Sequence, residues 1–145
     1  MRKLKRNGEN NLELFKSNRE ILEVEQMSPL TWAYIGDAVF ELYIRTYLIN
    51  TTHLKPNKLH VASISYVKAK SQAELLERLE PDLTEKEKEI VRRGRNTQTH
   101  HIAKNASMQD YMYATAFEAL IGYLYLTNQE ERLSQILKKT IDETA

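Results

Sequence analysis

The stretch that decides the fold is Trp32-Ala-Tyr-Ile-Gly-Asp-Ala-Val-Phe40, which surrounds one acid, Asp37, with apolar and small residues. Its apolar residues recur at intervals of three and four, the period of an α-helix. A second stretch, Ala114-Thr-Ala-Phe-Glu-Ala-Leu-Ile-Gly122, has the same character around Glu118. An ionised carboxylate in apolar surroundings must be paired, hydrated or bound to a cation, because unpaired burial costs several kcal/mol or shifts its pKa. These two acids are therefore the first candidates for a functional site.

Outside these two stretches the chain also predicts helices, and hence an all-α helical bundle. Ser28-Pro29 is a typical helix start, with Ser as N-cap and Pro at the first helical position, for a helix reaching about Leu48. Further helices are expected over about 58–80, 84–94, 109–126 and 128–141, and the third helix begins with a capping box formed by Thr84 and Glu87. Residues 95–107 are expected to form a polar loop. Residues 1–26 read as a basic N-terminal extension with one short helix near 12–15, and residues 27–145 as one domain.

Composition narrows the class of protein. The chain of 145 residues has no cysteine, which excludes disulfides and thiolate zinc sites and is typical of a reducing cytoplasm. Its longest apolar runs fall short of the roughly 20 residues that a membrane span needs. We therefore expect a cytoplasmic protein without a membrane partner.

Charge is segregated along the chain although the net charge is only +1. Residues 42–73 contain no acid, and neither do residues 90–109, whereas the stretch 74–89 between them is mainly acidic. The basic residues of the two acid-free blocks are Arg45, Lys55, Lys58, Lys68, Lys70, Arg92, Arg93, Arg95 and Lys104. One such block alone is usually a solvated helix face. Two blocks beside two unusual acids favour a polyanionic partner.

Helical geometry predicts that the two acids meet. At about 100° per residue, Asp37 lies opposite an expected core stripe of Trp32, Ile35, Val39 and Leu42. Glu41 follows Asp37 by one turn, and Gly36 would let another backbone approach closely. We expect the two helices to cross with Asp37 facing Glu118 around a hard cation, Mg²⁺ or Mn²⁺, since the ligands are oxygen atoms. The alternative is that Asp37 caps a neighbouring helix and Glu118 pairs with an Arg such as Arg45.

The segment Tyr34-Ile-Gly-Asp-Ala-Val-Phe-Glu41 resembles the catalytic-domain motif of the ribonuclease III family, and Phe117-Glu-Ala-Leu-Ile-Gly122 resembles that family's second acidic motif. Segments at 68–74, 93–96, 104–105 and 131–135 are similar to the Mini-ribonuclease 3 branch, which lacks a separate double-stranded-RNA-binding domain. The resemblance covers about residues 28–137. It implies an all-α homodimer that cleaves double-stranded RNA with Mg²⁺, leaves 5′-phosphate and 3′-hydroxyl ends, and matures the precursor of 23S ribosomal RNA.

The resemblance also implies roles for single residues. Asp37 and Glu118 occupy the essential acidic positions and would bind the metal, with Glu41 as a further ligand. Ala33 and Thr115 stand where larger ribonucleases III carry additional acids, so the centre is poorer in charge. The expected RNA-binding residues are Lys68, Lys70, Arg92, Arg93, Arg95, Lys104 and Asn105. The alternatives are a non-catalytic relative that binds RNA or assists ribosome assembly, and a helix-bundle interaction module with buried ion pairs.

Overall fold

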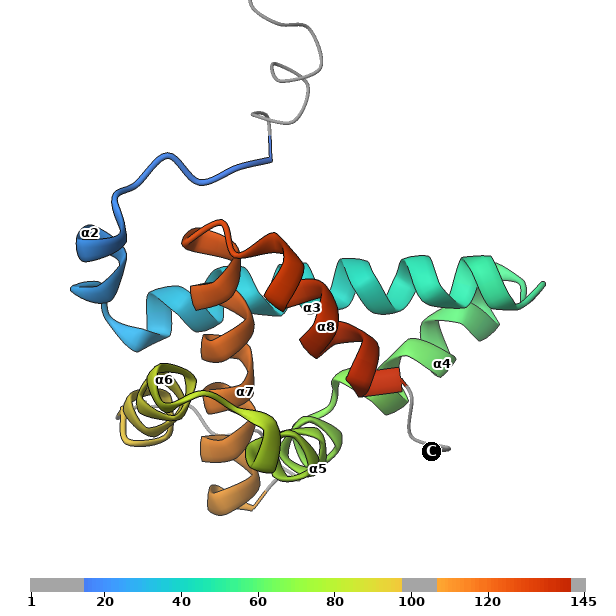
Figure 1. Cartoon of the computed structure of the whole chain (residues 1–145). Coiled ribbons are helices and arrows are strands. Elements are labelled where there is room, and N and C mark those ends of the chain that lie inside the picture. The colour runs from blue at the N-terminus through green and yellow to red at the C-terminus, as the bar shows by residue number, and fades with distance from the viewer. Residues whose placement is uncertain (1–14, 98–106, 142–145) are drawn as a thin grey trace, which may run out of the picture.

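The computed structural model describes residues 15–97 and 107–141, and these residues form helices without a strand (Figure 1). The elements in chain order are α2 (Ile21–Glu25), α3 (Pro29–Thr51), α4 (Pro56–Val67), α5 (Ala69–Leu79), the 3₁₀ turn η1 (Glu80–Asp82), α6 (Glu85–Arg95), α7 (Met108–Leu126) and α8 (Glu130–Ile141). The all-α prediction is confirmed. Ser28 caps α3, and Thr84 and Glu87 form a capping box at the start of α6, as expected. None of the described helices is long and apolar enough to cross a lipid bilayer.

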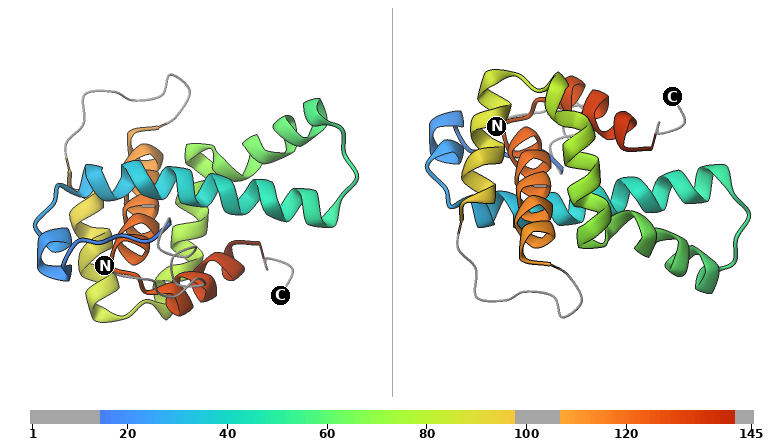
Figure 2. Two further views of the ribbon diagram at one scale, coloured as in Figure 1. Left: turned by 90° about the horizontal axis from the view of Figure 1, so that it is seen from above. Right: turned by 90° about the horizontal axis from the view of Figure 1, so that it is seen from below.

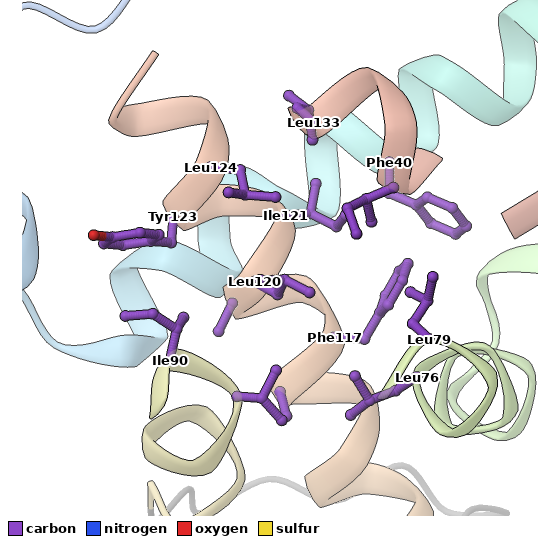
Figure 3. Packing of buried hydrophobic residues seen from close by; sticks show 14 of the residues in the cluster. Phe40, Leu76, Leu79, Ile90, Phe117, Leu120, Ile121, Tyr123, Leu124 and Leu133 are labelled. Atoms are coloured by element: carbon purple, nitrogen blue, oxygen red, sulfur yellow. The ribbon is translucent and has the colours of Figure 1, made fainter. Parts of the chain in front are cut away.

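Helix α7 is the centre of the fold, because α3, α5 and α6 all pack against it. Apolar residues occupy most of its circumference, so the helix buries several faces at once. Phe117 meets Phe40 of α3 edge-on, with 4.9 Å between ring centroids. Figure 3 shows the same ring beside Leu76 and Leu79 of α5, while Ile90 approaches from α6. The core is therefore built around α7, and side chains on its surface lie between neighbouring helices.

Helices α3 and α4 extend together to one side of the body as an arm (Figure 2). The core stripe of α3 differs from the prediction: the buried residues follow a spacing of four, at Trp32, Gly36, Phe40, Ile44 and Leu48. Leu42, which we expected in the core, is 67% exposed. The prediction failed because apolar residues surround α3, so their periodicity does not indicate which face meets the body.

Two helices replace the single helix predicted over about 58–80, and that prediction is wrong at Lys68. Lys68 has an extended backbone, with φ −70° and ψ 157°, and is both the C-cap of α4 and the N-cap of α5. The Ser71 hydroxyl donates to the Ser65 carbonyl oxygen across the break at 2.5 Å. The break lets α4 stay on α3 while α5 turns onto α7. Neither proline nor glycine marks it in the sequence.

The described part of the N-terminal extension packs on the body. Val24 of α2 is fully buried, and its carbonyl oxygen accepts a hydrogen bond from Trp32 Nε1 at 2.8 Å. The Tyr123 hydroxyl donates to Glu25 at 3.0 Å, and Lys86 approaches the same carboxylate at 3.2 Å. The domain boundary at residues 26 and 27 stays a prediction. Most of the short helix expected near 12–15 lies outside the described residues.

Candidate active site

The site begins with two glycines at the crossing of α3 and α7. A Cβ atom on Gly36 would overlap the carbonyl oxygen of Glu118, and one on Gly122 would overlap the carbonyl oxygen of Trp32. The two helices therefore touch backbone to backbone, a separation that only glycine permits at these positions. Asp37 follows Gly36 directly, and Glu118 lies one turn before Gly122 on α7. The close approach predicted for Gly36 is observed, and it brings the two acids to the same crossing.

Asp37 and Glu118 form a close carboxyl pair. Asp37 is exposed at the rim, whereas Glu118 is only partly exposed and its carboxyl group is largely withdrawn from water. Burial, followed by the nearby charge of Asp37, raises the pKa of Glu118 to about 8, and Asp37 is close enough to share a proton with it. Glu41 adds a weaker repulsion. The metal-free centre is therefore short of positive charge.

The basic side chain that we expected at this centre binds a different acid. Arg45, which we considered as a partner for Glu118, donates to Glu41 Oε2 at 2.9 Å instead. No ion pair to Asp37 or Glu118 occurs among residues 15–97 and 107–141. The alternative of a buried ion pair at Glu118 thus has no support in the described part of the structure. The two carboxyl groups therefore remain available to bind a metal ion.

Gln72 of α5 approaches Glu118 from another neighbouring helix. The amide lies near enough to lower the pKa of Glu118, against the effects of burial and of Asp37. Its Nε2 is the one buried side-chain nitrogen or oxygen without a hydrogen bond of normal length and angle in the described segments. Gln72 was missed in the sequence. The helical spacing could have revealed it. Residues 72, 76 and 79 share one buried face of α5, and Gln72 is the polar residue among two leucines.

The donor set fits a hard divalent cation that keeps part of its shell as water. Asp37 and Glu118 supply carboxylate oxygens, the ligand type that Mg²⁺ and Mn²⁺ prefer. Within the described residues, no three His, Cys, Asp or Glu side chains gather closely enough to hold a metal ion. Glu41 is engaged by Arg45 and does not complete such a group. A metal here would rely on two protein carboxylates, which agrees with the small residues at Ala33 and Thr115.

The expected RNA-binding residues fall into separate groups. Lys68 and Lys70 are exposed at the start of α5, the helix that carries Gln72. Arg92 and Arg95 line a different hollow of about 380 Å³ between η1 and α6, together with Lys88. None of the residues that line this hollow belongs to the carboxyl centre.

Arg93 is half-buried against the core. Its guanidinium lies 4.6 Å from the centre of the Trp32 ring and close to Glu25. Arg95 also has an aromatic neighbour, since its guanidinium lies 5.9 Å from the centre of the Tyr113 ring. Lys104 and Asn105 lie outside the described residues.

Comparisons with known proteins agree with this architecture. The ribonuclease III domain model matches residues 30–129. The chain is 49% identical over 121 residues to Mini-ribonuclease 3 of Clostridium tetani, covering 83% of this chain and 80% of that protein. It is 47% identical to Mini-ribonuclease 3 of Staphylococcus aureus, covering 86% and 94% of the two chains. A crystal structure of a Fusobacterium nucleatum protein superposes with a TM-score of 0.76 at 31% identity, covering 85% and 98%.

Proposed function

The chain belongs to the Mini-ribonuclease 3 branch of the ribonuclease III family of endoribonucleases, and we propose that it cleaves double-stranded RNA at the Asp37–Glu118 centre. The observation that carries the proposal is the glycine crossing of α3 and α7, which brings two carboxyl groups together with no basic partner among the described residues. Carboxyl groups so arranged repel each other until a proton or a cation lies between them.

Asp37 and Glu118 would hold the metal, for which we propose Mg²⁺, with Mn²⁺ as a substitute. When bound, the ion would lower the pKa of the attacking water and balance the charge that develops at the phosphate. The protein's own part is to fix the two carboxyl groups close together on rigid helices. Cleavage would leave 5′-phosphate and 3′-hydroxyl ends.

The substrate would be positioned through its backbone. Lys68 and Lys70 are exposed on the helix that carries Gln72 and would contact phosphates without reading bases, as is typical of proteins that recognise duplex RNA by shape. Arg92 and Arg95 could hold a second stretch of backbone at their own hollow. We propose the precursor of 23S ribosomal RNA as the natural substrate, which would place the protein in the cytoplasm.

A homodimer would place two such centres on one duplex, one for each strand. The support is an exposed apolar stripe on α3, formed by Leu30, Tyr34, Leu42 and Ile49. These residues recur at helical spacing on the flank of the helix that carries Asp37. Large apolar side chains exposed along one flank of a helix are typical of a protein interface.

The decisive test is incubation of purified protein with duplex RNA and Mg²⁺, with and without a chelator, followed by end-group analysis and cleavage-site mapping on 23S precursor RNA. Asp37→Asn should lower the cleavage rate by more than about a hundredfold, beyond what loss of an outer-shell partner typically costs. It should leave folding and RNA binding intact. Glu74→Gln, an exposed acid of α5 outside the carboxyl pair, is the matched control and should cleave normally.

The second candidate is a non-catalytic RNA-binding or ribosome-assembly protein. It is favoured by the small ligand set, since no group of three metal-binding side chains gathers among the described residues. RNA binding with no metal-dependent cleavage by the wild-type protein would support this role and contradict the first.

A further inference from the structure

We propose that Gln72 is a positioning residue for Glu118, whose amide holds the Glu118 carboxylate in the orientation that receives a divalent cation. The inference deepens the proposed function and rests on it, because it concerns the same centre. Gln72 would not touch the RNA or the metal, and would act only through Glu118.

The first support is the burial of an unsatisfied amide. Gln72 is 2% exposed, and its Nε2 is the single buried side-chain nitrogen or oxygen without a hydrogen bond of normal geometry in the described segments. Buried polar groups are almost always paired, and leaving one unpaired is destabilising. Leucine residues occupy the positions around it on this face of α5. An amide kept there in place of another leucine indicates a role other than stability.

The second support is the proximity of the amide to Glu118. Gln72 on α5 and Asp37 on α3 both lie close enough to the Glu118 carboxyl group to shift its pKa, in opposite directions. Glu118 is thus contacted by two helices that pack on α7 independently. An amide N–H can donate to one carboxylate oxygen and leave the other oxygen free for a cation.

The third support is the break at Lys68. A continuous helix through residue 68 would carry Gln72 along the arm with α4, because nothing would turn the chain toward α7. The extended backbone of Lys68 redirects α5 onto α7, and Gln72 is the first residue after the break that is buried against it. The same break puts Lys68 and Lys70, both exposed, at the start of the helix that carries Gln72.

The test replaces the amide by an apolar side chain of similar length, Gln72→Met, with Leu76→Met as matched control one turn along the same buried face. The readout is the rise in Tm of the metal-free protein as MnCl₂ is added without RNA, together with the Mg²⁺ concentration for half-maximal cleavage of duplex RNA. We expect Gln72→Met to need at least about tenfold more metal than the wild type in both the Tm titration and the cleavage assay. Removal of an outer-shell partner of a metal ligand typically has an effect of this size. The control should match the wild type, and RNA binding without metal should be unchanged in both variants.

The proposal would be overturned if Gln72→Met and the wild type needed the same metal concentrations for the half-maximal rise in Tm and for half-maximal cleavage. It would also be overturned if the Tm of the wild type did not respond to metal. If Gln72→Met does not fold, the side-chain NH₂ resonances of Gln72 in the wild type decide by NMR. Their chemical shifts should change when Mg²⁺ is added. Chemical shifts that stay unchanged at saturating Mg²⁺ would overturn the inference. A weakened metal response in Gln72→Met without any RNA cleavage by the wild type would leave the positioning role standing and reject the nuclease.

Discussion

Glu118 has a strongly shifted pKa at this centre. Its carboxyl group is withdrawn from water and faces Asp37, and both effects raise its pKa, to about 8. Near neutral pH the metal-free site therefore holds a proton that a cation must displace. Metal binding should release close to one proton, and metal affinity should rise with pH.

The raised pKa predicts how stability depends on pH. Because the folded protein holds a proton at Glu118 that the unfolded chain loses above about pH 4.5, the stabilisation is complete below that pH. It is lost as the pH rises toward about 8. In a chelator, the Tm of the wild type should fall over this window relative to that of Glu118→Gln, which cannot titrate. Scanning calorimetry of the two proteins from about pH 5 to pH 8 measures the difference.

Saturating Mg²⁺ is the internal control for that experiment, since it should flatten the pH dependence of the wild type by replacing the proton. Parallel Tm curves for wild type and Glu118→Gln in chelator would show that Glu118 titrates normally and that the carboxyl pair is not close in solution.

At the scale of the element, the crossing of α3 and α7 is what creates the site. Gly36 and Gly122 remove the side chains that would otherwise separate the two backbones, so their neighbours Asp37 and Glu118 are brought together by main-chain contact. The proposed metal affinity would therefore depend on helix packing at this crossing, because a change in the separation of the helices also separates the acids.

Gly36→Ala should therefore be severely destabilising. Its methyl group would overlap backbone atoms of α7, which cannot move without repacking the core. We expect a loss of more than about 3 kcal/mol in the free energy of unfolding, at or above the upper end for overpacked cores. Urea denaturation measures it, with Thr46→Ala on an exposed face of α3 as control. A Gly36→Ala protein as stable as wild type would show that the helices do not touch here.

Lys68 and Lys70, at the start of α5, are proposed to hold the RNA backbone, so they should contribute to binding more than to catalysis. Lys68→Ala combined with Lys70→Ala should weaken binding of duplex RNA and lower the salt slope by up to about two, one for each phosphate that a lysine no longer neutralises. Lys138→Ala, exposed on α8, is the control. Filter binding over a range of salt concentrations gives the slopes. Equal slopes for wild type and the double variant would place the RNA elsewhere.

At the scale of the whole molecule, the arm of α3 and α4 leaves apolar side chains in solvent that the core does not need. Tyr34 is 81% and Leu42 67% exposed, and both lie on the helix that carries Asp37. A second copy of the chain covering this stripe would bring two carboxyl centres into one assembly. Under this proposal, cleavage of both strands would depend on the dimer.

Leu42→Gln should shift the protein from dimer to monomer in sedimentation velocity without unfolding it, because the side chain adds little to the core of one chain. Leu22→Gln, at a similarly exposed apolar residue of α2, should leave the sedimentation unchanged. A wild-type protein that sediments as a monomer at micromolar concentration would contradict the role assigned to the stripe.

Local patterns in the sequence determined the helices and the pair of acids. Ser28-Pro29 and the Thr84 capping box act within one helical turn, so their effects can be read without knowing the rest of the fold. The apolar setting of Asp37 and Glu118 indicated two acids that needed a partner. Gly36 indicated the close approach, since the absence of a side chain is itself the signal.

Tertiary structure alone decided which surfaces meet. The break at Lys68, the exposure of Leu42 and the packing of Arg93 on Trp32 depend on the position of a neighbouring helix, and no local energy term specifies it. Helices α3 and α7 are apolar nearly all round, so many rotations satisfy their periodicity equally well. Contact between Gly36 and Gly122 fixes one of these rotations. The packing of α5 on α7 then places Gln72 beside Glu118.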